Sequence, residues 1–313
     1  MLANKVYILG GAQTDFTRNW AREGLELFDM FREVVIEGLI ATGLEPEQIE
    51  VGHVGNFVAE RFCQQGLMGG FFGHVSPELR DIPTSRHEAA CASGSMAALA
   101  AMSDIQAGHY ELACVVGAEL MRNVPGKVGA EYLGAATWAG KEALDCDYPW
   151  PHMFDQLAAE YDRRYGMHYD SLKTIARINY NNAARNPFAQ SRNWTIEAGH
   201  FSDNDQLNPL IEGRMRKMDC GQITDGAACI FLASERAARV YAQGRGLSLN
   251  EIPYIKGWGH RSAPLLLTEK LRISAQQPFI FPHVRLMVED ALKRAGMLSV
   301  NDLDGLETHD CFT

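Results

Sequence analysis

The sequence predicts a layered α/β protein whose sheet is largely buried. Short apolar runs, such as residues 6–9, 51–58 and 112–117, alternate along the chain with longer segments whose apolar residues recur at helical spacing. Apolar runs that alternate with helices are typical of strands covered on both faces. The composition agrees, because 46% hydrophobic residues, 22% charged residues and 29 glycines are ordinary values for an α/β enzyme.

The expected elements follow one another in a β-α-β rhythm. Residues 6–9 form the first strand, residues 25–42 a helix and residues 51–58 the next strand. A helix that ends at residues 104–108 leads into a strand at 112–117, and the sheet rhythm returns at 227–232.

The segment between residues 121 and 217 has a different character. It is richer in Tyr, Asn, Arg and Trp, and it predicts long polar helices at 154–165 and 171–185. We interpret it as an excursion from the α/β layers that covers a site. A further unit begins near Ile252, with a strand-like segment at 252–259 and a helix at 282–295.

Chain length and charge exclude several classes of protein. A chain of 313 residues is long enough for two domains with filled cores. The net charge of -10 argues against a general nucleic-acid binder, which needs a surplus of Lys and Arg. No apolar run reaches the roughly eighteen residues of a membrane span. Residues 1–11 lead into the strand-like VYILGG without the charged n-region and cleavage site of a signal peptide, so none is expected. We therefore expect a cytoplasmic protein without membrane or nucleic-acid partners.

Seven cysteines are scattered through the chain, and none is spaced as Cys-x-x-Cys, so neither a zinc site nor a disulfide framework is expected. Cys91 differs because a segment of small and apolar residues follows it, which predicts a helix buried on all sides. A cysteine in the first helical turn faces unpaired backbone N–H groups and the positive end of the helix dipole. Both favour the thiolate, although an isolated cysteine before a helix is more often structural.

The segment from His87 to Glu119, HEAACASGSMAALAAMSDIQAGHYELACVVGAE, resembles the nucleophile segment of the thiolase superfamily. There, Cys-x-[Ser/Thr]-Gly opens a central helix, and a strand ending in Gly-x-Glu follows. Other segments resemble the sterol-carrier-protein-2 type of thiolase and the acetyl-CoA acetyltransferases in the same order: VYILGGAQTDF at 6–16, helices at 154–187, DGAA at 225–228 and HDCF at 309–312.

The resemblance implies the five-layered α-β-α-β-α thiolase fold, built from two similar halves with a loop domain inserted in the first. We expect the N-terminal half at residues 1–120 and 218–250, the inserted loop domain at 121–217 and an incomplete C-terminal half at 251–313. A weak echo of the segment ending at Cys91 in the segment ending near His309 agrees with two related halves. The resemblance also implies a homodimer and, as in several thiolase relatives, a small OB-fold partner protein.

The activity implied by the resemblance is that of an acyl-CoA C-acyltransferase. Cys91 would take the acyl group of a coenzyme A thioester, and no covalently bound cofactor or metal is expected. His309 would face Cys91 as part of an oxyanion hole, where fixed donors stabilise developing charge. The alternative for His309 is a buried histidine that is hydrogen-bonded at a strand–loop junction.

The resemblance also suggests residues that bind coenzyme A. His152 and Met153 stand where the family often has a His-Met pair against the pantetheine arm, although a histidine in a Pro-bounded loop is nearly as good an explanation. Gly257 and Trp258 lie where thiolases present a small surface to pantetheine, which would let a ligand approach the backbone closely.

A short basic cluster, Arg214, Arg216 and Lys217, is a candidate for the phosphates of coenzyme A. Charge-assisted hydrogen bonds from Arg and Lys are a common means of holding phosphate. For any single one of these residues, a solvated cationic face is the simpler explanation.

The sequence departs from the family after HDCF, because only Thr313 follows. Thiolases continue with a Gly-His-Pro segment, whose His activates the nucleophile, and with a second Cys-x-Gly that moves a proton on the attacking acyl-CoA. Claisen condensation needs both a nucleophile and a base. Three explanations are open: a shortened version of a complete enzyme, which we prefer; strands supplied by another chain; or altered chemistry, such as a retro-aldolase acting on a CoA thioester.

Three classes of function other than an acyltransferase are considered. A partner-dependent or non-catalytic acyl-CoA-binding subunit is the main alternative. A cysteine hydrolase would need a Cys-His pair across a pocket, and His87 lies on the same incoming segment as Cys91. A zinc protease of the HExxH type is excluded because HEAAC lacks the second His.

Overall fold

The computed structural model describes residues 4–313, and the chain forms two compact units. Unit 1 contains the chain up to Asn123 together with Thr224–Trp258 and Ala291–Gly296, and unit 2 contains Val124–Ile223, Gly259–Asp290 and Met297–Thr313. The excursion expected at 121–217 therefore falls almost entirely in unit 2. The assignment of these segments to thiolase halves stays a prediction.

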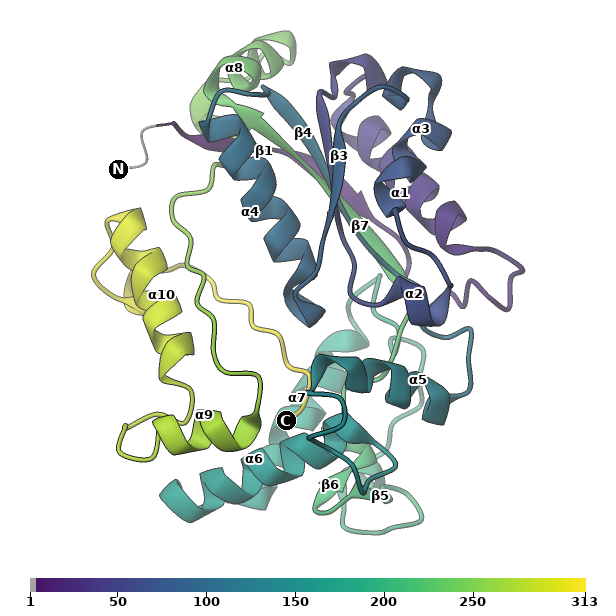
Figure 1. The fold of residues 1–313 in the computed structure, drawn as a ribbon, viewed down its shortest axis with the longest axis vertical. Helices are drawn as coiled ribbons and strands as arrows, with labels where there is room; N and C mark the ends of the chain where they lie inside the picture. Colours follow the sequence, from purple (N-terminus) through teal and green to yellow (C-terminus); the bar gives the residue numbers. More distant parts are fainter. Residues whose placement is uncertain (1–3) are drawn as a thin grey trace. The chain divides into compact units, whose positions relative to one another are not determined.

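A five-stranded mixed sheet forms the centre of unit 1 (Figure 1). Its order is β1-β7-β4-β2-β3, with β2 parallel to both of its neighbours and β7 antiparallel to both of its own. The strands are β1 (Val6–Gln13), β2 (Val51–Gly55), β3 (Thr84–His87), β4 (Leu112–Glu119) and β7 (Gly226–Ser234). Four of them lie where the sequence predicts strands, with ends that differ by a few residues.

Helices cover both faces of this sheet, which confirms the layered α/β prediction for unit 1 (Figure 1). One face packs against α1 (Leu27–Thr42) and α8 (Glu235–Gly244), and the other packs against α4 (Ser93–Gln106). The first face also carries the short helices α2 (Ala59–Phe62) and α3 (Phe72–Val75). Both faces of the sheet are therefore apolar, as expected for strands that read as continuous apolar runs.

Local sequence signals set the ends of α1. Glu26 and Asp29 form a reciprocal capping box at its first turn, so two backbone N–H groups without helical partners are satisfied. Gly43 ends the helix in the left-handed conformation with a φ of 58°, which glycine adopts without steric cost.

Unit 2 is mainly helical and has a two-stranded ribbon of its own. Its elements are α5 (Gly126–Leu133), α6 (Pro149–Tyr165), α7 (Tyr169–Ala183), β5 (Leu210–Glu212), β6 (Met215–Arg216) and α9 (Leu267–Ile273). A further helix, α10 (Pro282–Ala295), contributes residues to both units and has the bounds predicted from the sequence.

Two sequence predictions in unit 1 are wrong in detail. The expected strand at 252–259 is reduced to an isolated bridge between Tyr254 and Tyr7, because the chain leaves the edge of β1 after Ile255 donates to the carbonyl of Val6. The helix α4 is not buried on all sides. Its face toward the sheet is buried, whereas Gly94, Ser95 and Ser103 are exposed.

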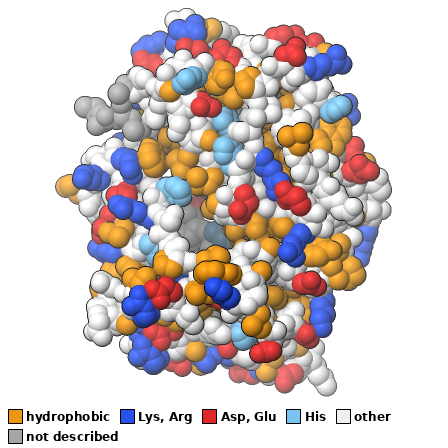
Figure 2. Space-filling view, in the orientation of Figure 1, with side chains coloured by type: hydrophobic (Ala, Val, Ile, Leu, Met, Phe, Trp, Pro, Cys, Tyr) orange, Lys and Arg blue, Asp and Glu red, His pale blue; other side chains and the backbone are white. Residues whose placement is uncertain are grey.

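No helix within residues 4–313 is long and apolar enough to cross a lipid bilayer. On the face shown in Figure 2, acidic and basic side chains are interspersed, and no continuous basic patch is seen. In the same described residues, no group of three or more His, Cys, Asp or Glu side chains is arranged to hold a metal ion.

Candidate functional site

Cys91 lies in the 3-10 turn Ala90–Ala92, which leads directly into α4. The turn begins with a backbone that L-residues rarely adopt, since Ala90 has a φ of 49°. No side chain caps the first turn of α4, so its first N–H groups have no side-chain acceptor at the N-cap. The structure thus places Cys91 one turn before the expected position, at the same electropositive end of the helix.

Cys91 is the exposed one of the seven cysteines, all of which lie in the described part of the chain. Burial raises the pKa of Cys63 to about 11, that of Cys229 to about 11 and that of Cys220 to about 12. These three thiols stay protonated at neutral pH and are poor nucleophiles. The contrast with the exposed Cys91 supports the prediction that one cysteine is different.

Glu119, which ends β4, is a site residue that the sequence analysis quoted only as part of a motif. Its carboxylate accepts a hydrogen bond from the backbone N–H of Phe57 at 2.5 Å and another from the side-chain amide of Asn56 at 2.9 Å. Burial raises the pKa of Glu119 to about 7. An acidic residue at the end of a buried apolar strand was the available signal in the sequence.

Asp225 of the DGAA motif is fully buried and holds the chain that follows Glu119. Its Oδ1 atom accepts hydrogen bonds from the backbone N–H groups of Met121 and Arg122, both at 2.8 Å. A buried carboxylate with two such donors fixes the direction in which the chain leaves β4. The motif therefore has a structural role at this end of the sheet.

His309 lies in unit 2, in an exposed segment without regular secondary structure. The residues after it are well anchored. The Phe312 ring stacks on Phe154 of α6 with 4.0 Å between ring centroids, and the carbonyl of Cys311 accepts from the N–H of Gly221 at 2.8 Å. This anchoring fixes the HDCF segment within its own unit. The pairing of His309 with Cys91 stays a prediction.

His152 and Met153 lie on α6, where the two side chains have different surroundings. The His152 ring is 2.8 Å from the side-chain amide of Gln156, one turn further along the helix. Met153 lines a mainly apolar cavity of about 210 Å³ within unit 2. Apolar neighbours in its wall include Trp150, Leu157 and Phe281.

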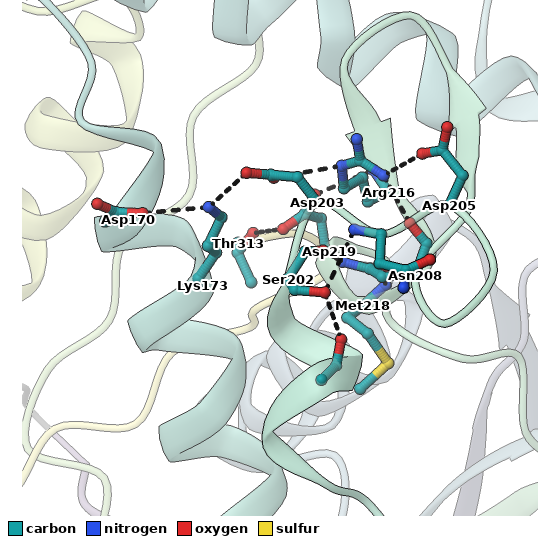
Figure 3. A network of polar contacts seen from close by, with 12 residues as sticks. Asp170, Lys173, Ser202, Asp203, Asp205, Asn208, Arg216, Met218, Asp219 and Thr313 are labelled. Carbon is teal, nitrogen blue, oxygen red and sulfur yellow. Dashed lines mark hydrogen bonds and ion pairs between the residues drawn. The ribbon is translucent and has the colours of Figure 1, made fainter.

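Arg214 and Arg216 both have acidic partners inside unit 2. Arg214 binds Asp155 through its side-chain Nε, 2.9 Å from Oδ1. Arg216 binds Asp205 at 2.7 Å and the carbonyl of Asn208 at 2.7 Å (Figure 3). These contacts position both guanidinium groups, and their proposed contact with coenzyme A phosphates stays a prediction.

The network around Arg216 extends to α7 and to the end of the chain (Figure 3). Lys173 bridges Asp170 and Asp203 at 3.1 and 3.0 Å, and Thr313 donates its hydroxyl to Asp219 at 2.9 Å. The neighbouring Lys217 is exposed.

Gly257 and Trp258 pack against the last turns of α10. A Cβ atom added at Gly257 would lie 2.3 Å from the carbonyl oxygen of Ala291, so the close approach at this glycine is made by a helix. The Arg294 guanidinium lies 3.9 Å from the centre of the Trp258 ring and donates to the Trp258 carbonyl at 2.7 Å. The expected contact of these two residues with pantetheine stays a prediction.

Comparison with known proteins identifies a matching family and several relatives. The family model described as "Thiolase, N-terminal domain" matches residues 6–236. An acetyl-CoA acetyltransferase of Methanothermobacter thermautotrophicus is 26% identical over 311 residues, which cover 98% of this chain and 74% of that protein. The corresponding enzyme of Methanocaldococcus jannaschii is 27% identical over 311 residues, with 98% and 72% covered.

Solved structures agree on the fold. Human mitochondrial 3-ketoacyl-CoA thiolase in complex with CoA superposes with a TM-score of 0.69 at 16% identity, covering 99% of this chain and 80% of that one. The Ltp2–ChsH2(DUF35) aldolase superposes with a TM-score of 0.64 at 19% identity, covering 94% of this chain and 70% of the other.

The described fold is that of the thiolases, as the sequence predicts. The chain belongs to the thiolase family, and the enzyme class that it shares with its relatives is that of the acyltransferases.

Proposed function

We propose that this protein is a thiolase-type acyl-CoA C-acyltransferase in which Cys91 forms an acyl thioester. The observation that carries the proposal is the position of Cys91, an exposed thiol at the start of α4 in a chain whose thiols at Cys63, Cys220 and Cys229 are held protonated by burial. The family match and the acetyl-CoA acetyltransferase relatives support the same reading.

The proposed first step balances as a thioester exchange. The Cys91 thiolate attacks the carbonyl carbon of an acyl-CoA, and the carbonyl π electrons move to oxygen. Collapse of this tetrahedral species breaks the bond from carbon to the CoA sulfur, which leaves as a thiolate and takes up a proton. His309 is proposed to stabilise the oxyanion.

The remaining site residues are proposed to bind the coenzyme A part of the substrate. His152, Met153, Gly257 and Trp258 would contact the pantetheine arm, and Arg214 and Arg216 would meet the phosphates. The substrate is thus a coenzyme A thioester, used in lipid metabolism in the cytoplasm. We further propose a homodimer and a small OB-fold partner protein; similarity to the Ltp2–ChsH2(DUF35) aldolase, which is named for two components, supports a partner.

Intact-protein mass spectrometry tests the acyl-enzyme. The protein is incubated with acetyl-CoA and, separately, with a longer acyl-CoA, beside Cys91→Ala and the control Cys146→Ala. We expect a mass gain equal to the acyl group in the wild type and in Cys146→Ala, and none in Cys91→Ala. The absence of an adduct from folded wild-type protein would exclude the acyltransferase mechanism.

Protection from alkylation distinguishes the enzyme from a binding subunit. Iodoacetamide is applied with and without acyl-CoA, and the modification of Cys91 is followed by peptide mass spectrometry. An enzyme shows both acylation and protection at Cys91. A non-catalytic acyl-CoA-binding subunit shows protection alone.

A further inference from the structure

The hydroxyl group of Ser93, the first residue of α4, contacts the turn that carries Cys91. Ser93 is 4% exposed, so its hydroxyl group is shielded from water and needs partners within the protein. The hydroxyl donates to the carbonyl of Ala90 at 2.6 Å and accepts from the backbone N–H of Ala89 at 3.0 Å. One side chain therefore connects α4 to both of the residues that precede Cys91.

Ala90 has a backbone conformation that costs free energy. Its φ of 49° lies in the left-handed region, where the Cβ atom crowds the following carbonyl oxygen. The N–H of Ala90 donates to the Glu88 carboxylate at 2.6 Å, and its carbonyl accepts from the backbone N–H of Ser93 as well as from the hydroxyl. Such a conformation persists only where the surrounding contacts fix it. The contacts of Ser93 thus help to set the direction of the backbone at the next residue, Cys91.

The start of α4 is fixed against the sheet. A Cβ atom added at Gly55, the last residue of β2, would lie 2.6 Å from both the Cα and the nitrogen of Gly94. The backbone of α4 therefore rests directly on the end of β2, with no side chain between them. Because Ser93 is adjacent to Gly94, its hydroxyl binds the turn to a part of the helix that packs closely on the sheet.

Ser103, near the other end of α4, shows the ordinary contact of a serine within a helix. Its hydroxyl donates to the carbonyl of Leu99, four residues earlier, at 2.9 Å, and this bond stays inside the helix. Ser93 has, in addition to its bond to a carbonyl, the bond from the N–H of Ala89, which lies outside α4. The difference indicates that Ser93 stabilises the chain before the helix as well as the helix.

We propose that Ser93 is a positioning residue for Cys91, because its hydroxyl group holds the turn at Ala90 and so keeps the thiol at the start of α4. The unpaired N–H groups of a helix start favour a thiolate. Without the hydroxyl, Ala90 relaxes to a negative φ and Cys91 moves away from these N–H groups. The importance of this position for acyl transfer rests on the proposed function of Cys91.

Site-resolved alkylation of Cys91 by iodoacetamide at pH 7 tests the role of Ser93. Rates are measured by peptide mass spectrometry for the wild type, Ser93→Ala, Ser93→Thr and Ser103→Ala. We expect Ser93→Ala to react about three- to tenfold more slowly, since Cys91 loses the stabilisation that a helix start gives to a thiolate.

The other two variants are the matched controls. Ser93→Thr keeps the hydroxyl group and Ser103→Ala removes only a bond within the helix, so both should react within about twofold of the wild type. A Ser93→Ala variant that reacts at the wild-type rate would overturn the proposal. The same holds for a Ser93→Thr variant that is as slow as Ser93→Ala.

A second substitution separates positioning from general damage to the fold. Glycine adopts a positive φ without steric cost, so Ala90→Gly can keep the turn when the hydroxyl is absent. We expect Ala90→Gly in the Ser93→Ala background to react at least about twofold faster than Ser93→Ala alone. If the double variant stays as slow, Ser93 does not act through the conformation of Ala90, and the proposal is wrong.

Hydrogen exchange of the wild type does not depend on how the Ser93 variants fold. The measurement follows the backbone amide of Ala89 at residue resolution. Because this amide donates to a buried hydroxyl, it should exchange at least about tenfold more slowly than in an unstructured peptide. Exchange at the unstructured rate would contradict the proposal, since the bond would not persist in solution.

Single-turnover acylation by acetyl-CoA connects Ser93 to the proposed function. We expect Ser93→Ala to lower the rate constant at saturating acetyl-CoA and to leave the half-saturating concentration nearly unchanged, because the buried Ser93 acts through Cys91. Slow alkylation of Ser93→Ala without an acyl adduct in the wild type would reject the acyltransferase and keep the role of Ser93. An acyl adduct in the wild type with equal alkylation rates would do the reverse.

Discussion

The two units are stabilised in different ways. In unit 1, the sheet is covered on both faces by apolar side chains, and large residues such as Phe231 and Phe72 are completely buried. In unit 2, α6 has no fully buried residue and α7 has only Ala176. Instead, arginines that bind carboxylates and backbone carbonyls connect its segments.

This difference indicates that unit 1 is a rigid support and that unit 2 is the more adaptable region. Burial of apolar area is not directional and gives the sheet a single tightly packed arrangement. Charged networks near the surface contribute less free energy per contact and are screened by salt. We therefore expect unit 1, which contains the sheet and Cys91, to be the more stable of the two units. The stability of unit 2 should depend more strongly on ionic strength.

The largest effect is expected from Phe231→Ala in β7. Removing a completely buried ring should lower the free energy of unfolding by about 3–5 kcal/mol, because it leaves a cavity between the sheet and α1. Urea unfolding measures the loss. The control Phe279→Ala removes a ring that is 42% exposed and should change the free energy of unfolding by less than about 1 kcal/mol. Equal losses of stability in the two variants would contradict the view that buried apolar side chains stabilise unit 1 more than unit 2.

Glu119→Gln should change stability in a pH-dependent way. The pKa of Glu119 is raised in the folded protein, so the folded state binds more protons than the unfolded state between the ordinary pKa of 4.5 and about pH 7. Wild-type stability therefore falls across this window as pH rises, by at most about 3 kcal/mol. In Glu119→Gln this fall should be absent.

Thermal unfolding at pH 4.5, 6 and 8 measures this effect. The difference in stability between Glu119→Gln and the wild type should become more favourable to the variant from the lowest pH to the highest. A difference that is constant across these three pH values would show that Glu119 has an ordinary pKa.

A smaller effect is expected from Arg164→Met in α6. Arg164 is 8% exposed, and it binds Glu160 at 2.6 Å and the Ser274 carbonyl at 2.9 Å. Its loss should cost about 2 kcal/mol, since hydrogen bonds from a charged donor to the segment after α9 disappear. Hydrogen–deuterium exchange should increase in α6 and α9.

The adjacent Arg163 provides the matched control for this prediction. It binds the same Glu160 but is 66% exposed, so Arg163→Met should change stability by less than about 0.5 kcal/mol. If Arg163→Met were as damaging as Arg164→Met, the carbonyl contacts of Arg164 would not explain the stability of this region.

The smallest effect is expected from Lys173→Met in the network of Figure 3. Lys173 bridges Asp170 and Asp203, which are 93% and 69% exposed. We expect a loss of about 0.5 kcal/mol at low ionic strength that disappears at about 1 M salt. Urea unfolding at both salt concentrations measures it. A loss that persists at high salt would indicate packing by the Lys173 side chain.

Local sequence determined much of unit 1 and the candidate nucleophile. The apolar runs at β1, β2, β4 and β7 predict strands because a strand covered on both faces needs apolar residues at every position. The small residues after Cys91 predict that a helix begins there, because helix starts are set by local sequence, whereas the role of Cys91 as a nucleophile is implied by the resemblance to the thiolases.

Only the tertiary structure decided the chemical surroundings of these residues. Burial raises the proton affinity of Glu119, and two hydrogen-bond donors from the chain after β2 oppose this rise, although Asn56 lies far from Glu119 in sequence. The exposed face of α4, the acidic partners of Arg214 and the helix against Gly257 likewise depend on distant segments. Sequence periodicity reports which residues share a face, whereas the electrostatic environment of a residue is set by whatever packs against that face.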